Sequence, residues 1–384
     1  MRFLFAWQHV SADSRLSGEA ALPAVLERLA CFEAPAPAWE ADLLPARLSD
    51  YDPGWLDRFC LSGQGVWRRR MSSVPGEGTT ATLRMAPITL LRRQNLAAWQ
   101  AITTSPEPVP PLSPAAEAVR AALGAGGALF FEDLLVRLRL LPSQLETALS
   151  ELAGQGLAAC DGFAGLRALS ARTGTGRHRT REARAAQMAA AGRWSLTGMP
   201  RASAALPGAE TGTGGGIEIE AGAEFAARVL LDRYGVVFRR LCTREPWLPP
   251  WRELVAVYRR REARGELRGG RFLALASGEQ FALPEAVGLL REVRRRDRAQ
   301  ELVSLSAADP LNLVGIVTPG NTVPRGSGRV LYLDGVPIAS QSGREVHMSE
   351  DLDRGAAWEA RKALLRRGVG ASRLLVAADG TTTP

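Results

Sequence analysis

The residues with the clearest chemical role in this sequence are arginines at helical spacing. Arg252, Arg259, Arg260 and Arg264 alternate with apolar residues at intervals of three and four, between Pro250 and Gly265. A helix over this stretch would bury one face and present guanidinium groups on the other. Because such groups pair with phosphate oxygens, the pattern predicts a helix that contacts a nucleic-acid backbone.

The elements around this helix predict a winged helix over residues 221–297. Apolar residues at helical spacing indicate two shorter helices over 223–241. Gly269-Gly270 is expected to let the two short apolar runs that follow it, 272–276 and 280–283, fold back as a hairpin. Three helices followed by a hairpin define a winged helix, which usually places its third helix in a nucleic-acid groove.

A second winged helix is predicted over residues 114–170, after a proline-rich linker at 105–113. Ser143 and Glu146 have the spacing of a capping box, which would start its third helix. Residues 165–169 are expected to form one strand of its wing. The third helix contains no arginine, so we interpret this unit as architectural.

The remaining chain divides into three segments. Residues 1–104 predict a helical, winged-helix-like domain with a β-segment, and 171–220 predict a basic, glycine-rich linker. Residues 298–384 predict a small α+β domain, with a hairpin at Asp334-Gly335. The expected fold class is therefore α+β: a tandem array of winged helices with a small C-terminal cap.

Further arginines flank the winged helices. They are Arg177, Arg179, Arg181 and Arg184 in the basic linker, and Arg271, Arg294 and Arg295 in and after the second wing. The net charge of +8 and the isoelectric point near 10.1 favour a polyanionic partner, either a nucleic acid or an anionic membrane surface. Next to winged helices, we interpret these arginines as contacts to DNA, either single-stranded or duplex with a single-stranded tail.

Several classes of chemistry are disfavoured. Lys362 is the only lysine and lies in no Gly-Lys-Ser/Thr motif, which excludes a P-loop NTPase motor in this chain. The four cysteines and three histidines have no metal-ligand spacing, so we expect neither a metal nor another cofactor. No run of eighteen apolar residues occurs, so we expect a cytoplasmic, nucleoid-associated protein without a membrane partner.

Five of the nine tryptophans fall within the first 104 residues: Trp7, Trp39, Trp55, Trp67 and Trp99. Tryptophans can stack nucleobases or anchor a core. We favour the core interpretation for these five.

Five long strings resemble the C-terminal region of the large helicase-related (Lhr) family. They are RFLFAWQHV, PAWEADLLPARLSDYDPGWLDRFCLSG, GGRFLALASGEQFALPEAVGLLR, SAADPLNLVGIVTPG and RVLYLDGVPIA. The resemblance covers nearly the whole chain and implies an array of winged helices similar to AlkZ-type DNA glycosylases, which can form homo-oligomers. Family members also carry a helicase core, to which ATP and Mg would belong. The abrupt apolar start at Arg2 fits a split gene or a fragment that lacks this core.

The resemblance also implies a uracil-DNA glycosylase activity that rests on an aspartate. Such an enzyme flips a nucleotide into a pocket, where a carboxylate stabilises the cationic sugar or activates water. The candidates are Asp309, Asp334 and Asp379, of which one at most would be catalytic, followed by Glu279. Each aspartate also suits a turn or the polar tail. Gln8 does not match the Gln-x-Asp/Gln motif of the AlkZ-type enzymes.

Two functions of different classes follow. The first is a DNA-binding accessory module of an Lhr-type ATP-dependent DNA repair helicase, which would partner a helicase core. The alternative is a DNA glycosylase that hydrolyses an N-glycosidic bond. A multi-winged-helix transcription regulator is a weaker third alternative, because the sequence shows no small-molecule domain and resembles the Lhr family.

Overall fold

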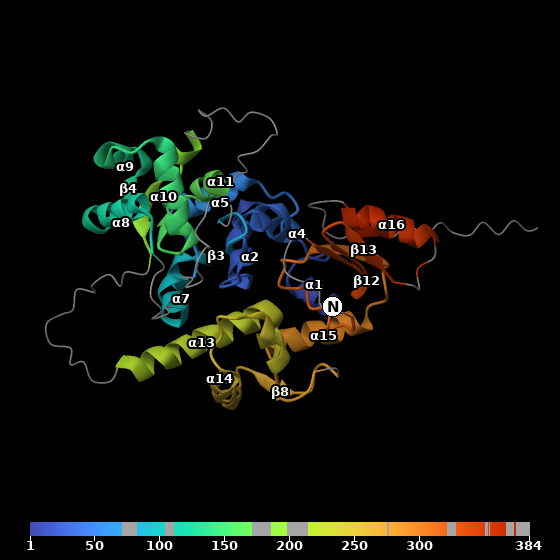
Figure 1. The fold of residues 1–384 in the computed structure, drawn as a ribbon. Coiled ribbons are helices and arrows are strands. Elements are labelled where there is room, and N and C mark those ends of the chain that lie inside the picture. The colour runs from blue at the N-terminus through green and yellow to red at the C-terminus, as the bar shows by residue number, and fades with distance from the viewer. Residues whose placement is uncertain are drawn as a thin grey trace, which may run out of the picture.

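A computed structural model gives the arrangement of the chain (Figure 1). It describes residues 1–70, 83–103, 111–170, 186–197, 214–274, 276–320, 328–349, 352, 354–365 and 372–373. Of the predicted site residues, Arg177, Arg179, Arg181, Arg184 and Asp379 lie outside this description. None of the described helices is long and apolar enough to cross a membrane.

The first module is a set of short helices around a three-stranded sheet of order β1-β3-β2. Its elements are α1 (Arg2–Trp7), η1 (Glu19–Ala21), α2 (Leu22–Arg28), β1 (Ala34–Pro35), α3 (Ala36–Ala38), η2 (Trp39–Leu43), α4 (Leu44–Arg47), α5 (Pro53–Leu61), β2 (Gly65–Arg68), β3 (Pro87–Arg92), η3 (Arg93–Asn95) and α7 (Leu96–Thr103). Asp52 caps α5 by accepting a hydrogen bond from the Gly54 amide at 2.7 Å. Four of the five tryptophans predicted as core anchors are buried, and Trp55 is half-buried.

The second module is a winged helix with a sheet of order β4-β6-β5. Its elements are α8 (Pro114–Gly126), β4 (Leu129–Phe130), α9 (Phe131–Leu138), α10 (Pro142–Gly154), β5 (Ala158–Cys160), α11 (Phe163–Ser170) and β6 (Arg193–Leu196). The central strand, β6, falls inside the predicted 171–220 linker, so the linker prediction is wrong there. The buried indole of Trp194 explains why this short strand belongs to the module.

Two local predictions for the second module are also wrong. Residues 165–169 belong to the helix α11, because Phe163, Leu166 and Leu169 lie one turn apart and are buried on the same core. Helix α10 begins at Pro142, with the side chain of Gln144 accepting a hydrogen bond from the Leu141 amide at 2.9 Å. Its start therefore differs from the predicted box of Ser143 and Glu146.

The third module is the winged helix predicted over 221–297. It consists of α13 (Gly214–Tyr234), β7 (Val236–Phe238), η4 (Arg239–Arg244), α14 (Trp251–Ala263), β8 (Arg268–Gly270), β9 (Gln280–Ala282) and α15 (Pro284–Arg295), with sheet order β7-β9-β8. Gly269-Gly270 pairs with Gln280 and Phe281 inside the sheet. The first strand of the hairpin is therefore β8, which contains these glycines, and the described residues of the predicted strand 272–276 form no strand.

The C-terminal module is a five-stranded antiparallel sheet with one helix. Its elements are β10 (Glu301–Ser306), β11 (Arg329–Leu333), β12 (Val336–Ser342), β13 (Glu345–Met348), α16 (Arg354–Leu365) and β14 (Ser372–Arg373), in the order β13-β12-β11-β10-β14. The hairpin predicted at Asp334-Gly335 is confirmed, and both residues have positive φ, 47° and 79°. Those values suit the tight turns that join two twisted strands.

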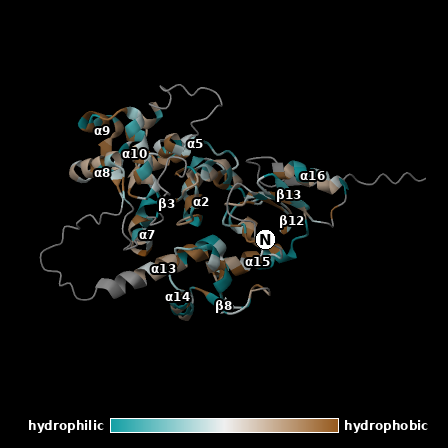
Figure 2. Ribbon diagram, viewed as in Figure 1, coloured by the Kyte–Doolittle hydropathy of each residue, from teal (hydrophilic) through white to brown (hydrophobic). Residues whose placement is uncertain are grey.

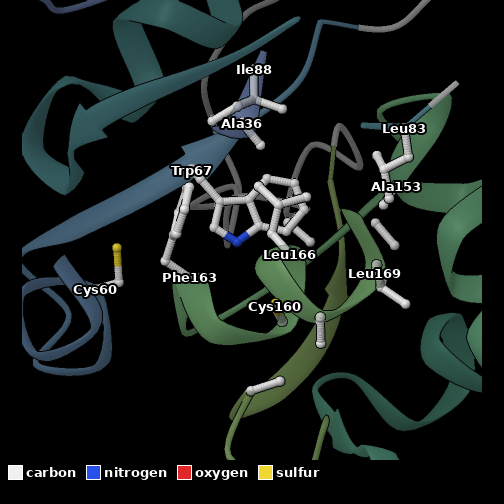
Figure 3. Close-up of a cluster of buried hydrophobic side chains, with 14 of the residues drawn as sticks. Ala36, Cys60, Trp67, Leu83, Ile88, Ala153, Cys160, Phe163, Leu166 and Leu169 are labelled. Atoms are coloured by element: carbon white, nitrogen blue, oxygen red, sulfur yellow. The ribbon is translucent and has the colours of Figure 1, made fainter. Parts of the chain in front are cut away.

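Two cores cross the module boundaries. The first joins the N-terminal module to the second: Trp67 lies against Phe163 and Cys160 (Figure 3), and its indole N–H donates to the Gly162 carbonyl at 3.3 Å. The second core joins α1 and α7 to the winged helix of the third module and to the C-terminal sheet. Within it the rings of Phe5 and Tyr332 meet edge to face at 5.2 Å. The modules therefore pack as one body.

Candidate nucleic-acid interface

Helix α14 occupies the third-helix position of the third module. Leu254, Val257 and Tyr258 form its buried face, and the Tyr258 ring lies 5.1 Å from that of Phe281 in β9. Its arginines Arg252, Arg259 and Arg260 are exposed, and the ribbon of α14 is coloured largely as hydrophilic in Figure 2. The predicted division of this helix into an apolar face and an arginine-rich face is therefore confirmed.

Three of the predicted DNA-binding arginines, two on α14 and one at its C-cap, form ion pairs with glutamates. The pairs are Arg259–Glu279 at 2.7 Å, Arg260–Glu224 at 3.1 Å and Arg264–Glu266 at 3.0 Å. Glu279 comes from the wing, Glu224 from α13 and Glu266 from the segment that follows α14. The first two lie 20 and 36 residues from their arginines, so those two pairs could not be predicted from local spacing. Exposed ion pairs add little stability. A phosphate must nevertheless compete with each glutamate for its arginine.

Freer guanidinium groups lie at the start of α14, in the wing and on α15. The Arg252 side chain is 86% exposed, with Nε 4.0 Å from Glu253. Arg271, Arg294 and Arg295 are exposed and form no ion pair with any residue that the structure describes. Arg291 and Arg298 share these properties. The accessible positive charge is therefore concentrated on α15 and the wing more than on α14.

The geometry of α15 suits contact with an anion. Val287 and Val293 are buried against the body of the protein, which leaves the arginines on the outer side. Arg291 and Arg295 line an open hollow of about 470 Å³ together with Arg296 and Glu292, which form an ion pair with each other. Arg294 and Arg295 also lie in the last helical turn, where positive charge is favoured by the helix dipole. The basic end of α15 is therefore stable without acidic partners.

The side chain of Gln280 organises the wing. This buried amide accepts hydrogen bonds from the Phe272 and Leu273 amides, both at 2.9 Å. It donates to the carbonyls of Leu273 and Ala276 at 2.9 and 2.8 Å. These four bonds satisfy backbone groups that no strand pairing satisfies. The wing that carries Arg271 is consequently a defined loop.

Asp309, the first candidate carboxylate, is buried in an ion pair. Its side chain is 1% exposed, and its two oxygens accept hydrogen bonds from Arg47 Nη1 and Nη2 at 2.8 and 3.0 Å. Arg47 Nη2 also donates to Gln8 Oε1 at 2.5 Å. Asp309 Oδ1 accepts from the Leu311 amide at 2.9 Å as well, as in an Asx turn. This geometry leaves no oxygen facing a substrate and favours a structural role.

Asp334, the second candidate, is half-buried at the apex of the β11–β12 hairpin. Its carboxylate accepts hydrogen bonds from the Gln300 and Glu301 amides at 3.2 and 3.1 Å. It lines a small pocket of about 170 Å³ at the end of α15, together with Glu301, Asp13, Arg2 and Arg296 among others. Burial raises the pKa of Glu301, and the nearby charges of Asp13 and Asp334 raise it further.

Glu301 could not be predicted as a site residue from the sequence. Its neighbours Asp13 and Asp334 come from distant parts of the chain, and no local motif marks the site. Glu279, the last candidate, is exposed in the wing and paired with Arg259. Among the residues that the structure describes, no three histidine, cysteine or acidic side chains gather as metal ligands would.

These modules and their arginines define a tandem winged-helix protein of α+β class. Residues 1–87 and 217–302 match two family profiles described as winged-helix domains of the large helicase-related protein, the third and fourth of its series. The chain thus carries winged-helix domains of the Lhr family and fits the C-terminal region of its members.

Two curated relatives agree with this placement. The chain is 28% identical over 408 residues to a Mycolicibacterium smegmatis protein named Lhr helicase/probable uracil glycosylase. It is 30% identical over 322 residues to the Escherichia coli protein named Lhr helicase/uracil glycosylase. The alignments cover 99% and 77% of this chain, but 24% and 19% of the relatives. The chain therefore spans a quarter of their length or less.

Proposed function

We propose that this chain is a DNA-binding accessory module of an Lhr-type helicase and holds DNA on the winged helix of its third module, residues 217–302. The observation that carries the proposal is the group of exposed arginines without acidic partners on α15 and the wing, beside a winged helix of a helicase family. Guanidinium groups presented in this way displace the counterions of a nucleic-acid backbone. Attachment to a helicase core is part of the proposal and is supported by the names of the two relatives.

The salt dependence of binding tests this proposal. If six to eight arginines contact phosphates, the logarithm of the binding constant should fall with the logarithm of salt concentration at a slope of about −5 to −7. Fluorescence anisotropy of a labelled duplex with a single-stranded tail, titrated with the full chain without ATP, measures this slope. A slope near zero would contradict an electrostatic contact surface.

A uracil-DNA glycosylase is the second candidate, favoured by the pocket that contains Asp334 and Glu301. This pocket lies at the basic end of α15, where a DNA strand held by the arginines would pass close by. Of its four acidic side chains, Asp334 offers a group to stabilise a cationic sugar, and Glu301 offers a second group that holds its proton to higher pH. The names of both relatives include a uracil glycosylase.

We expect a glycosylase of this design to cleave uracil-containing single-stranded DNA without ATP, as seen on a gel after alkali treatment. Asp334→Asn should abolish cleavage and retain DNA binding, whereas Glu345→Gln, which changes an exposed acid of the same sheet, should change neither. As a general acid, Glu301 would make cleavage slower as the pH rises through its raised pKa. Loss of cleavage in Asp379→Asn alone would assign the reaction to the C-terminal tail instead. Absence of cleavage by the unaltered chain would refute this candidate.

A further inference from the structure

Helix α16 displays an exposed tryptophan, which is unusual in this chain. All nine tryptophans are described, and the other eight are buried or half-buried. Trp358 is 68% exposed. An indole carries one of the largest apolar surfaces of any side chain, and an exposed one commonly marks a contact site.

Three cations surround this indole on the same face of the helix. Arg354 precedes Trp358 by four residues, and Arg361 and Lys362 follow it by three and four, so all three are its helical neighbours. All three are exposed. Arg354 and Arg361 form no ion pair with any described residue, and Lys362 Nζ lies 3.9 Å from Glu359. The face thus combines one aromatic plane with positive charge.

The opposite face of α16 holds this arrangement in place. Ala360 and Leu364 are fully buried, in one cluster with Leu302 of β10 and Leu331 of β11. The helix therefore cannot turn Trp358 inward without losing that packing. Figure 1 shows α16 on the outside of the C-terminal sheet, with its outer face uncovered by any labelled element.

The chemistry of this face selects one class of partner. A membrane surface would need several exposed apolar side chains along the helix, and among the side chains of α16 that the structure describes Trp358 is the one exposed large apolar group. A protein partner that buried the indole would also have to desolvate three cations. An unpaired nucleotide matches both features, because every base has a π-face and every phosphate carries a negative charge.

We propose that the outer face of α16 binds single-stranded DNA, with an unpaired base stacked on Trp358 and the flanking phosphates held by Arg354, Arg361 and Lys362. The bases of a duplex are already stacked on one another, so this site discriminates in favour of single strands. It extends the DNA binding proposed for the winged helix of the third module to a second surface. The chain would then hold a duplex and an unpaired strand at separate places.

The test compares Trp358→Ala with the unaltered full chain on three ligands, by fluorescence anisotropy. We expect binding to a short single-stranded oligonucleotide to weaken by roughly 5- to 100-fold, the range for loss of one base–aromatic stack. Trp358→Phe should restore most of the affinity, because a phenyl ring still stacks. An abasic oligonucleotide of the same length, which keeps the phosphates, and a blunt duplex should bind both proteins equally.

Unchanged affinity of Trp358→Ala for the base-bearing strand would overturn the proposal and point to a protein partner for this face. An equal loss of affinity on the abasic strand would also overturn it, because stacking requires a base. The duplex separates this result from a failure of DNA binding itself. If the unaltered chain binds no duplex, the winged-helix proposal fails, whereas duplex binding without any effect of Trp358 refutes only the α16 site.

Discussion

Replacing Asp309 with alanine is expected to reduce the free energy of unfolding by about 3–5 kcal/mol. The substitution leaves the guanidinium of Arg47 buried without a counter-charge, because that side chain is as inaccessible as Asp309 itself. Its remaining partners, the Leu43 carbonyl and Gln8, are neutral and cannot replace a carboxylate. Urea unfolding followed by tryptophan fluorescence measures the loss.

A double substitution separates the charge effect from the loss of packing. Arg47→Met combined with Asp309→Leu removes both charges and keeps much of the volume, so it should recover a large part of the lost stability. Glu345→Ala, which removes an exposed carboxylate, should change stability by less than about 0.5 kcal/mol. A stably folded Asp309→Ala protein that binds uracil-containing DNA and no longer cleaves it would contradict the structural role assigned here.

Replacing Arg291, Arg294 and Arg295 together with glutamine is expected to weaken duplex binding on the order of tenfold or more at moderate salt. Each lost phosphate contact reduces the slope of the salt dependence by about 0.9 for duplex DNA, so the slope should become shallower by about 2.7. The loss should be similar for unrelated duplex sequences, because phosphate contacts carry no base information. Anisotropy titrations over a range of salt concentrations give both quantities.

The matched control is the triple replacement of Arg259, Arg260 and Arg264 with glutamine. It removes the same formal charge, so any long-range electrostatic effect is common to the two variants. Because these arginines are engaged by Glu279, Glu224 and Glu266, we expect the smaller change in slope from this variant. Equal changes in slope would show that DNA displaces the glutamates and contacts the arginines of α14 directly.

Features encoded by neighbouring residues were predictable from the sequence. The apolar spacing from Leu254 to Tyr258 gave α14, and Asp334-Gly335 gave the hairpin of the C-terminal sheet. Short elements were not predictable in this way. Strand β6 has four residues, too few for a period to emerge, and its assignment depends on pairing with two strands more than thirty residues earlier in the chain.

The candidate site was less predictable because its electrostatics depends on distant residues. The sequence gives the arginines of α14 but not Glu224 or Glu279, which reach them from other elements. The sequence predicts Asp309 as a turn residue, and the turn is confirmed. It does not predict that Asp309 pairs with Arg47. Burial of one ion pair and exposure of another decide which charges are accessible to a ligand. Neither follows from composition.

The closure of the first module on the last has a consequence for synthesis of the chain. Arg47 is synthesised 262 residues before its partner Asp309. The indole of Trp7 likewise precedes Asp232, whose carbonyl accepts its hydrogen bond. At usual elongation rates the wait for Asp309 lasts on the order of tens of seconds. Throughout it, Phe5 of α1 lacks the ring of Tyr332, against which it packs in the folded protein. The nascent chain is therefore a natural client for chaperones that shield exposed hydrophobic segments.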